Sequence, residues 1–185
     1  MAARFSIRTW RKNYKKTTPT KTRRQISVQI EQTLASGEGI STNNLISCLR
    51  NLSCFKGVIP QDYLDQIFLE SKMCFVVNVD FSTQPGSHWI AIHIEDPNCF
   101  IIDSLGLKFM KLEQGSKPLF RFISRLSKKL RIHKTSLIQN PLSPFCGFYC
   151  ILFLISFSFS CFREINSLFS TNLRKNDSLL LYLFK

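Results

Sequence analysis

Acidic residues and long apolar runs are both scarce in this chain. The first shortage makes the chain strongly basic, and the second argues against a membrane-spanning protein. The 185 residues include 12 Asp and Glu against 25 Lys and Arg, which gives a net charge of +13. The longest apolar run, residues 147–162, contains three serines and is sixteen residues long, whereas a membrane-spanning helix needs about 20. We therefore expect neither a membrane span nor secretion, and we interpret the run as a helix in the core of one globular domain.

Paired cysteine motifs are missing too, and histidine is rare. The seven cysteines form no Cys-x-x-Cys pair, and their odd number without an export signal favours reduced thiols inside a cell and no metal site. His93 lies in the middle of an apolar strand, and His133 follows a basic helix. His88 is the preferred functional histidine, because Gly86 and Ser87 form a loop in front of the strand that it opens.

The positive charge is concentrated at the N-terminus. Residues 1–24 hold nine Lys and Arg and no acid. This composition is typical of a flexible solvated segment, and it also suits contact with DNA phosphates, nuclear targeting or a mitochondrial presequence. We expect residues 1–40 to form a basic flexible tail and residues 41–185 to form the folded domain. The tail residues predicted to contact nucleic acid are Arg11, Lys12, Lys15 and Lys16.

Apolar periodicity predicts strands between helices with a hairpin among them, and therefore an α+β domain. Residues 25–35 fit either a short strand or a weak helix. We expect helices at 43–52, 62–70, 117–131 and 147–162, strands at 74–79, 88–95, 99–103 and 135–138, and at most one further helix at 178–184. One face of the 117–131 helix is either a solvated charged surface or a second row of phosphate contacts. That row consists of Lys117, Arg121, Arg125 and Lys129.

The stretch from Gln139 to Cys150 joins a proline-containing loop to the apolar helix. Its two prolines forbid helix as far as residue 144, so Cys146 lies at the first turn. Unpaired N–H groups and the helix dipole favour a thiolate there, which suits a cysteine nucleophile. An inert buried thiol is the alternative interpretation, and Cys150, one turn later, fits it better.

An acid beside His88 would orient its imidazole, and the residues alone leave two candidates. Asp80 is near in sequence, whereas Asp103 follows the return strand of the hairpin. A turn over residues 96–98 places Asp103 opposite residue 91, about 10 Å along the strand from His88. Contact between the two would need twist, a bulge or another register.

Three motifs in the order His, acid, Gln, Cys resemble the adenovirus-type maturation proteases, and the proteases of ubiquitin-like modifiers share that order. They are Gly86-Ser87-His88-Trp89, residues 100–106 with Asp103-Ser104-Leu105-Gly106, and Gln139 seven residues before Cys146-Gly147. Residues 55–62 and the run Cys-Gly-Phe-Tyr-Cys are most similar to the versions carried by Maverick/Polinton elements and adintoviruses. The resemblance covers roughly residues 41–160.

The resemblance implies an adenain-like cysteine endopeptidase with a papain-like mechanism and a central mixed sheet flanked by helices, one of which is buried and carries the nucleophile. Cys146 would be the nucleophile, His88 the general base, Asp103 the orienting acid and Gln139 an oxyanion donor, without a cofactor. The implied substrates are capsid and core precursors in the host nucleus or virion. The implied enzyme is a monomer, stimulated by DNA and a viral peptide as in adenoviruses. A protease for ubiquitin-like modifiers and a non-enzymatic DNA-binding relict of the same fold are the alternatives.

Overall fold

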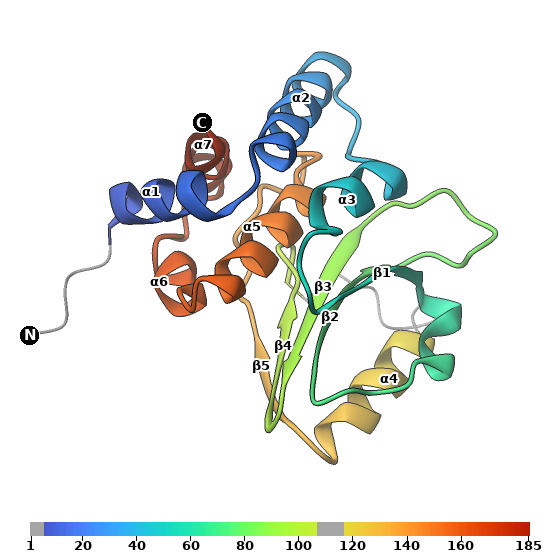
Figure 1. Cartoon of the computed structure of the whole chain (residues 1–185). Coiled ribbons are helices and arrows are strands. Elements are labelled where there is room, and N and C mark those ends of the chain that lie inside the picture. The colour runs from blue at the N-terminus through green and yellow to red at the C-terminus, as the bar shows by residue number, and fades with distance from the viewer. Residues whose placement is uncertain (1–5, 107–116) are drawn as a thin grey trace, which may run out of the picture.

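A five-stranded mixed sheet with helices on both faces forms the centre of the computed structural model, which describes residues 6–106 and 117–185 (Figure 1). The strands, in spatial order, are β1 (Phe55–Pro60), β2 (Lys72–Asn78), β3 (Trp89–Glu95), β4 (Asn98–Ile102) and β5 (Arg131–Lys134). The β1–β2 and β4–β5 pairs are parallel, and the two inner pairs are antiparallel. The expected α+β architecture with a mixed central sheet is confirmed.

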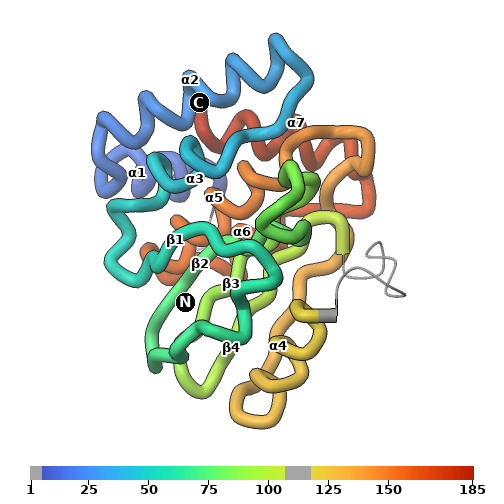
Figure 2. Tube along the Cα trace, turned by 90° about the vertical axis from the view of Figure 1, so that its right-hand side faces the viewer, coloured from blue at the N-terminus to red at the C-terminus, as the bar shows by residue number. Residues whose placement is uncertain are grey.

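Seven α-helices and one 3-10 helix accompany the sheet in the described part of the chain. They are α1 (Ile7–Thr17), α2 (Thr20–Ser36), α3 (Thr42–Leu49), η1 (Gln61–Gln66), α4 (Lys117–Ser127), α5 (Cys146–Ser158), α6 (Phe162–Ser167) and α7 (Leu173–Phe184). Helix α4 covers one face of the sheet, and the other α-helices gather on the opposite side (Figures 1 and 2). This arrangement gives two separate apolar cores.

Alternation along β3 explains the two cores. Ile90, Ile92 and Ile94 pack toward α4, whereas Trp89 and Ala91 pack toward α5. Helix α5 is apolar on all sides, and all its residues from 146 to 156 are buried, as expected of a helix enclosed by other elements. It is enclosed by β3, α3, α6 and α7. No helix in the described ranges is long and apolar enough to cross a bilayer.

The expectation of a flexible tail over residues 1–40 is wrong for the described part of that segment, since α1 and α2 occupy most of it. Trp10 and Tyr14 of α1 are buried and stacked, with ring centroids 4.9 Å apart, and both meet Phe184 of α7 edge-on. Because these two aromatic residues are four positions apart, they share one helix face. That face docks in the core even though the rest of the helix is basic. Residues 1–5 lie outside the described residues.

Helix α2 resolves the ambiguity over residues 25–35. Ile26 and Ile30 are buried on one face of this helix, which ends at Gly37 with a left-handed φ of 72°. Helix α3 begins after an N-cap at Ser41, whose side chain accepts the Asn44 N–H.

Several other boundaries differ from the prediction. Strand β1 is unexpected, and the helix expected at 62–70 is the shorter η1. The strand expected at 135–138 is wrong: β5 lies at Arg131–Lys134, because its parallel partner β4 ends at Ile102. The helix expected at 147–162 ends earlier, at Ser158. Two residues later, Ser160 has a positive φ of 53°, which is not helical. Two helices, α6 and α7, follow instead of one.

Candidate active site

His88 and Asp103 lie at one end of the sheet because of the antiparallel pairing of β3 and β4. His88 directly precedes β3, and Asp103 directly follows β4. The register pairs Ala91 with Ile102, one residue away from the register that we expected. If this register is extended by one residue, Asp103 stands opposite residue 90. The side chains of His88 and Asp103 meet beyond the strand ends, where His88 Nε2 lies 2.8 Å from Asp103 Oδ1.

The structure distinguishes the two candidate acids. The Asp80 carboxylate accepts the backbone N–H of Ser87 at 2.5 Å and so holds the loop in front of His88. Asp103 is buried, with 1% of its surface exposed, and its Oδ1 also accepts the N–H of Leu105 at 3.0 Å. The Thr135 hydroxyl accepts the Asp103 N–H and donates to its carbonyl oxygen, each at 2.9 Å. The carboxylate that meets His88 is therefore fixed from several sides.

Cys146 is the first residue of α5, and it lines a cavity of about 640 Å³ together with His88 and Gln139. Cys146 and His88 are each 8% exposed. Burial lowers the pKa of His88, but its interactions with Asp103 and Cys146 outweigh burial and raise this pKa to about 9. Asp103 occupies Nε2, so the ring nitrogen open to Cys146 is Nδ1, which is buried and makes no hydrogen bond among the described residues. An imidazolium here can donate a proton into the cavity, and a cysteine at the start of a helix can supply a nucleophile.

Gln139 is held in place by two serines. Its amide oxygen accepts the Ser104 hydroxyl at 2.6 Å, and its amide nitrogen donates to the Ser143 carbonyl at 2.6 Å. The Ser104 carbonyl also accepts the N–H groups of Ile138 and Gln139. Among the described residues, one of the two amide N–H groups of Gln139 is used by Ser143, and the residue lines the cavity. Ser104 is a positioning residue that the sequence analysis did not identify, although it directly follows Asp103.

Close packing at the start of α5 explains Gly147. A Cβ atom at this position would overlap Cγ2 of Ile40 and lie 3.2 Å from Cδ1 of Trp89. The Trp89 indole N–H donates to the Ile40 carbonyl at 3.1 Å, which ties the segment before α3 to the opening of β3. Ile40 is thus the neighbour that leaves no room for a side chain at position 147.

The two predicted nucleic-acid rows do not lie together: α1 and α4 are on opposite sides of the molecule (Figures 1 and 2). On α1, Lys12, Lys15 and Lys16 are exposed, while the Arg11 guanidinium lies over the Tyr182 ring, 4.6 Å from its centroid.

The row on α4 is partly neutralised by an acid from η1. Arg121 and Arg125 approach the Asp65 carboxylate at 3.4 and 3.9 Å, and Arg125 also donates to the carbonyl of Leu64. Lys129 is exposed beyond the end of the helix. The side chain of the remaining member of the row, Lys117, lies outside the described residues.

Comparison with known proteins gives one family match and several related sequences. The family model described as adenovirus endoprotease matches residues 55–173. The protease of Human adenovirus B serotype 3 is 26% identical over 137 residues, which cover 68% of this chain and 66% of that protein. The protease of Equine adenovirus B serotype 2 is 34% identical over 107 residues, which cover 52% of this chain and 53% of that protein. The chain thus spans between about half and two thirds of these relatives.

Two solved structures have a weaker likeness. A crystal structure of HopZ1a in complex with IP6 aligns with a TM-score of 0.41 and 13% identity, covering 90% of this chain and 56% of that one. A structure of AvrA with IP6 and CoA aligns with a TM-score of 0.43 and 14% identity, covering 86% of this chain and 67% of that one. TM-scores below 0.5 establish no common fold.

Proposed function

Because the chain belongs to the adenovirus endoprotease family, we propose that it is a cysteine endopeptidase that cleaves capsid and core precursors of a virus or a Maverick/Polinton-type element. One observation carries the proposal: the His88–Asp103 pair, with its 2.8 Å contact, lies at the cavity that Cys146 and Gln139 also line. Nucleophile, base and amide donor thus line one space that a peptide carbonyl could enter, while the buried orienting acid contacts the base outside that space.

The proposed reaction follows from the positions of these groups. The Cys146 thiolate attacks the peptide carbonyl, and His88 protonates the leaving amine. Asp103 holds the imidazole tautomer through Nε2 and stabilises its positive charge. The backbone N–H of Cys146 and the remaining amide N–H of Gln139 stabilise the oxyanion. Water, deprotonated by His88, then hydrolyses the thioester and frees Cys146.

A peptide-based thiol-reactive probe tests the proposal. We expect it to label Cys146, located by mass spectrometry, and Cys146→Ala to abolish both labelling and cleavage of precursor peptides. Cys150→Ala is the matched control, because burial raises the pKa of the Cys150 thiol well above its usual value and keeps it inert. Cleavage that survives in Cys146→Ala but disappears in Cys150→Ala would overturn the assignment of the nucleophile.

We further propose that the exposed lysines of α1 bind duplex DNA without sequence preference in a nucleus or virion, where the monomeric enzyme meets its precursors. The support is the row Lys12, Lys15 and Lys16, which faces solvent because Trp10 and Tyr14 face the core. Phosphate contacts of this kind weaken steeply with salt. Stimulation of cleavage by DNA or by a short viral peptide stays a prediction.

Charge reversal at Lys12, Lys15 and Lys16 is a better test of DNA binding than truncation, which would remove core residues. We expect weaker binding to random duplex DNA in fluorescence anisotropy and a smaller slope of log affinity against log salt. Reversal of Arg121 is the matched control, since this arginine already contacts Asp65 at 3.4 Å. An unchanged salt slope in the α1 variant would remove α1 from DNA binding.

A further inference from the structure

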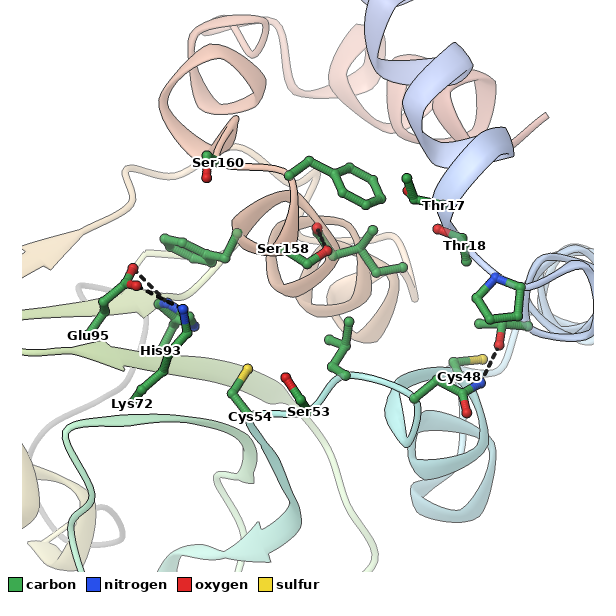
Figure 3. Close-up of a pocket in the computed structure, with 17 residues that line it drawn as sticks. Thr17, Thr18, Cys48, Ser53, Cys54, Lys72, His93, Glu95, Ser158 and Ser160 are labelled. Atoms are coloured by element: carbon green, nitrogen blue, oxygen red, sulfur yellow. Dashed lines mark hydrogen bonds and ion pairs between the residues drawn. The ribbon is translucent and has the colours of Figure 1, made fainter.

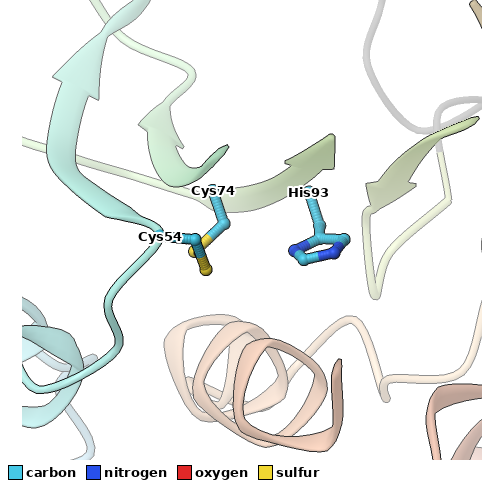
Figure 4. Close-up of side chains that lie close together, drawn as sticks. All are labelled: Cys54, Cys74 and His93. Carbon is cyan, nitrogen blue, oxygen red and sulfur yellow. The ribbon is translucent and has the colours of Figure 1, made fainter. Parts of the chain in front are cut away.

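Three potential ligands of a soft metal ion converge away from the active site. Cys74 of β2 is paired with His93 of β3, and Cys54 directly precedes β1, where its carbonyl accepts the Cys74 N–H at 2.7 Å. The two sulfur atoms and an imidazole nitrogen of His93 all lie within 4.8 Å of one another. Figure 4 shows the three side chains on the same side of the strands, directed toward a common space.

The imidazole of His93 is buried without a hydrogen-bond partner. Only 2% of its surface is exposed, and neither ring nitrogen makes a hydrogen bond to the described residues. Phe157 stacks on the ring with centroids 3.9 Å apart, and the nearest carboxylate oxygen, on Glu95, is 3.8 Å from Nε2. An unsatisfied buried polar group is costly, and a bond from this imidazole to a metal ion would offset that cost.

The chemistry of the donors selects the metal. Two thiolates and a neutral imidazole suit zinc, whereas calcium and magnesium require oxygen ligands. The Sγ atoms of Cys54 and Cys74 are 2.9 Å apart. With Zn–S bonds of about 2.3 Å in a tetrahedron, the two sulfurs would stand about 3.8 Å apart. Binding therefore requires them to separate by roughly 0.9 Å, a distance that small side-chain rotations can provide.

We propose that Cys54, Cys74 and His93 bind one zinc ion. The fourth coordination position of this ion faces the adjoining cavity, which Glu95 also lines. This cavity has a volume of about 480 Å³, and Cys54, His93 and Glu95 line it. Figure 3 shows these three on one side of the cavity and Cys48 on the other. The Glu95 carboxylate is also paired with Lys72 at 2.9 Å, and breaking this exposed pair costs little.

The site is structural in this proposal. It would connect β2 and β3 to the segment that enters β1. His93 lies five residues after His88, which directly precedes the same strand. The separation is about 17 Å, too far for the metal to act on a substrate at Cys146. Sequence spacing did not reveal the site, because its ligands come from neighbouring strands and lie about twenty residues apart in the chain.

The test is metal binding by the full chain in a Cys146→Ala background, since the active-site thiol and imidazole could themselves bind zinc. We expect one zinc per chain by elemental mass spectrometry and competition with a chromophoric chelator. Cys54→Ser and His93→Gln should each weaken affinity at least about tenfold. Cys48→Ala, which removes a buried thiol from the other side of the same cavity, should leave affinity unchanged. Zinc should also raise the Tm of the Cys146→Ala protein but not that of Cys54→Ser.

Cobalt substitution provides a readout that does not depend on whether the variants fold. Cobalt bound to the Cys146→Ala protein should show the visible and near-ultraviolet absorption of tetrahedral coordination with two thiolates. Absence of that spectrum, or equal zinc affinity with and without Cys54, would overturn the proposal. A Cys54–Cys74 disulfide in protein prepared under reductant would overturn it as well, because the two sulfurs would then be bonded to each other.

Discussion

Replacing Asp103 with asparagine separates the charge of this residue from its role in orienting His88. Asp103 Oδ1 accepts hydrogen bonds from His88 Nε2 at 2.8 Å and from the Leu105 N–H at 3.0 Å. An asparagine whose oxygen takes the place of Oδ1 keeps both bonds and the same imidazole tautomer. The negative charge alone is lost, so any change in proton affinity at His88 reports the electrostatic contribution of Asp103.

The expected magnitude follows from the pKa of His88. Burial favours the neutral ring, yet Asp103 and Cys146 raise the pKa from 6.5 to about 9. A hydrogen bond to a charged group contributes about 1.5–3 kcal/mol and a neutral one about 0.5–1.5 kcal/mol. The difference, about 1–1.5 kcal/mol, corresponds to about one pH unit. Asp103→Asn should therefore lower the pKa of His88 by about one unit.

The sign of the pH effect follows from which form is active. His88 is fully protonated well below pH 9 and loses its proton as the pH rises through 9. Activity that depends on an imidazolium–thiolate pair should therefore fall on the alkaline side. In Asp103→Asn this fall should begin about one pH unit earlier, so kcat/KM should be up to about tenfold lower on the alkaline limb and little changed at neutral pH, where the imidazolium still prevails.

The assay is kcat/KM for a precursor peptide as a function of pH, with Asp80→Asn as control. The Asp80 carboxylate accepts the Ser87 N–H, whereas the carboxylate that contacts His88 belongs to Asp103. Removing the charge of Asp80 should therefore leave the alkaline limb in place. The asparagine Nδ2 would occupy the position of Asp103 Oδ2, which is buried without a partner, so the Tm of each variant is recorded as well. An alkaline limb that does not move in Asp103→Asn, or moves equally in Asp80→Asn, would refute the reasoning.

Three further substitutions test the packing at the start of α5, the docking of α1 and the support of Gln139. Gly147→Ala should destabilise the protein by about 1–3 kcal/mol in denaturant unfolding, because its Cβ would overlap Ile40 Cγ2; adding Ile40→Ala should recover part of that loss, and a neutral single variant would contradict the packing. Trp10→Ala should cost about 3–5 kcal/mol in the same assay, whereas a flexible tail would show no change. Ser104→Ala should lower kcat several-fold with KM little changed, since about 1 kcal/mol of hydrogen bonding holds the Gln139 amide; unchanged kcat would argue against a positioning role.

Local sequence patterns are enough to predict the position of Cys146, but the acid that contacts His88 depends on the register of two strands. Prolines and the apolar run suffice to place Cys146 at a helix start, and the structure has α5 begin there. The acid next to His88 depends on the hairpin turn. We expected a three-residue turn, but Glu95 pairs with Asn98, which leaves two residues in the turn and moves Asp103 by one step. Both turn lengths suit the same residues, so the residue pattern alone leaves Asp80 and Asp103 open. The resemblance implied Asp103, and Asp103 is the acid that contacts His88.

The N-terminal segment shows where composition misleads, and why that matters for the site. The lysines of α1 face solvent, whereas its two buried aromatic residues pack on Phe184, which is remote in sequence. Helix α7 then reaches the site: the Asn176 amide donates to the Ile138 carbonyl at 2.8 Å, next to Gln139 in the chain. A docked α1 is therefore connected through α7 to the residue beside Gln139, the proposed oxyanion donor. A flexible tail would have no such connection, so any DNA bound at α1 would rest on a helix anchored in the same core as the proposed catalytic groups.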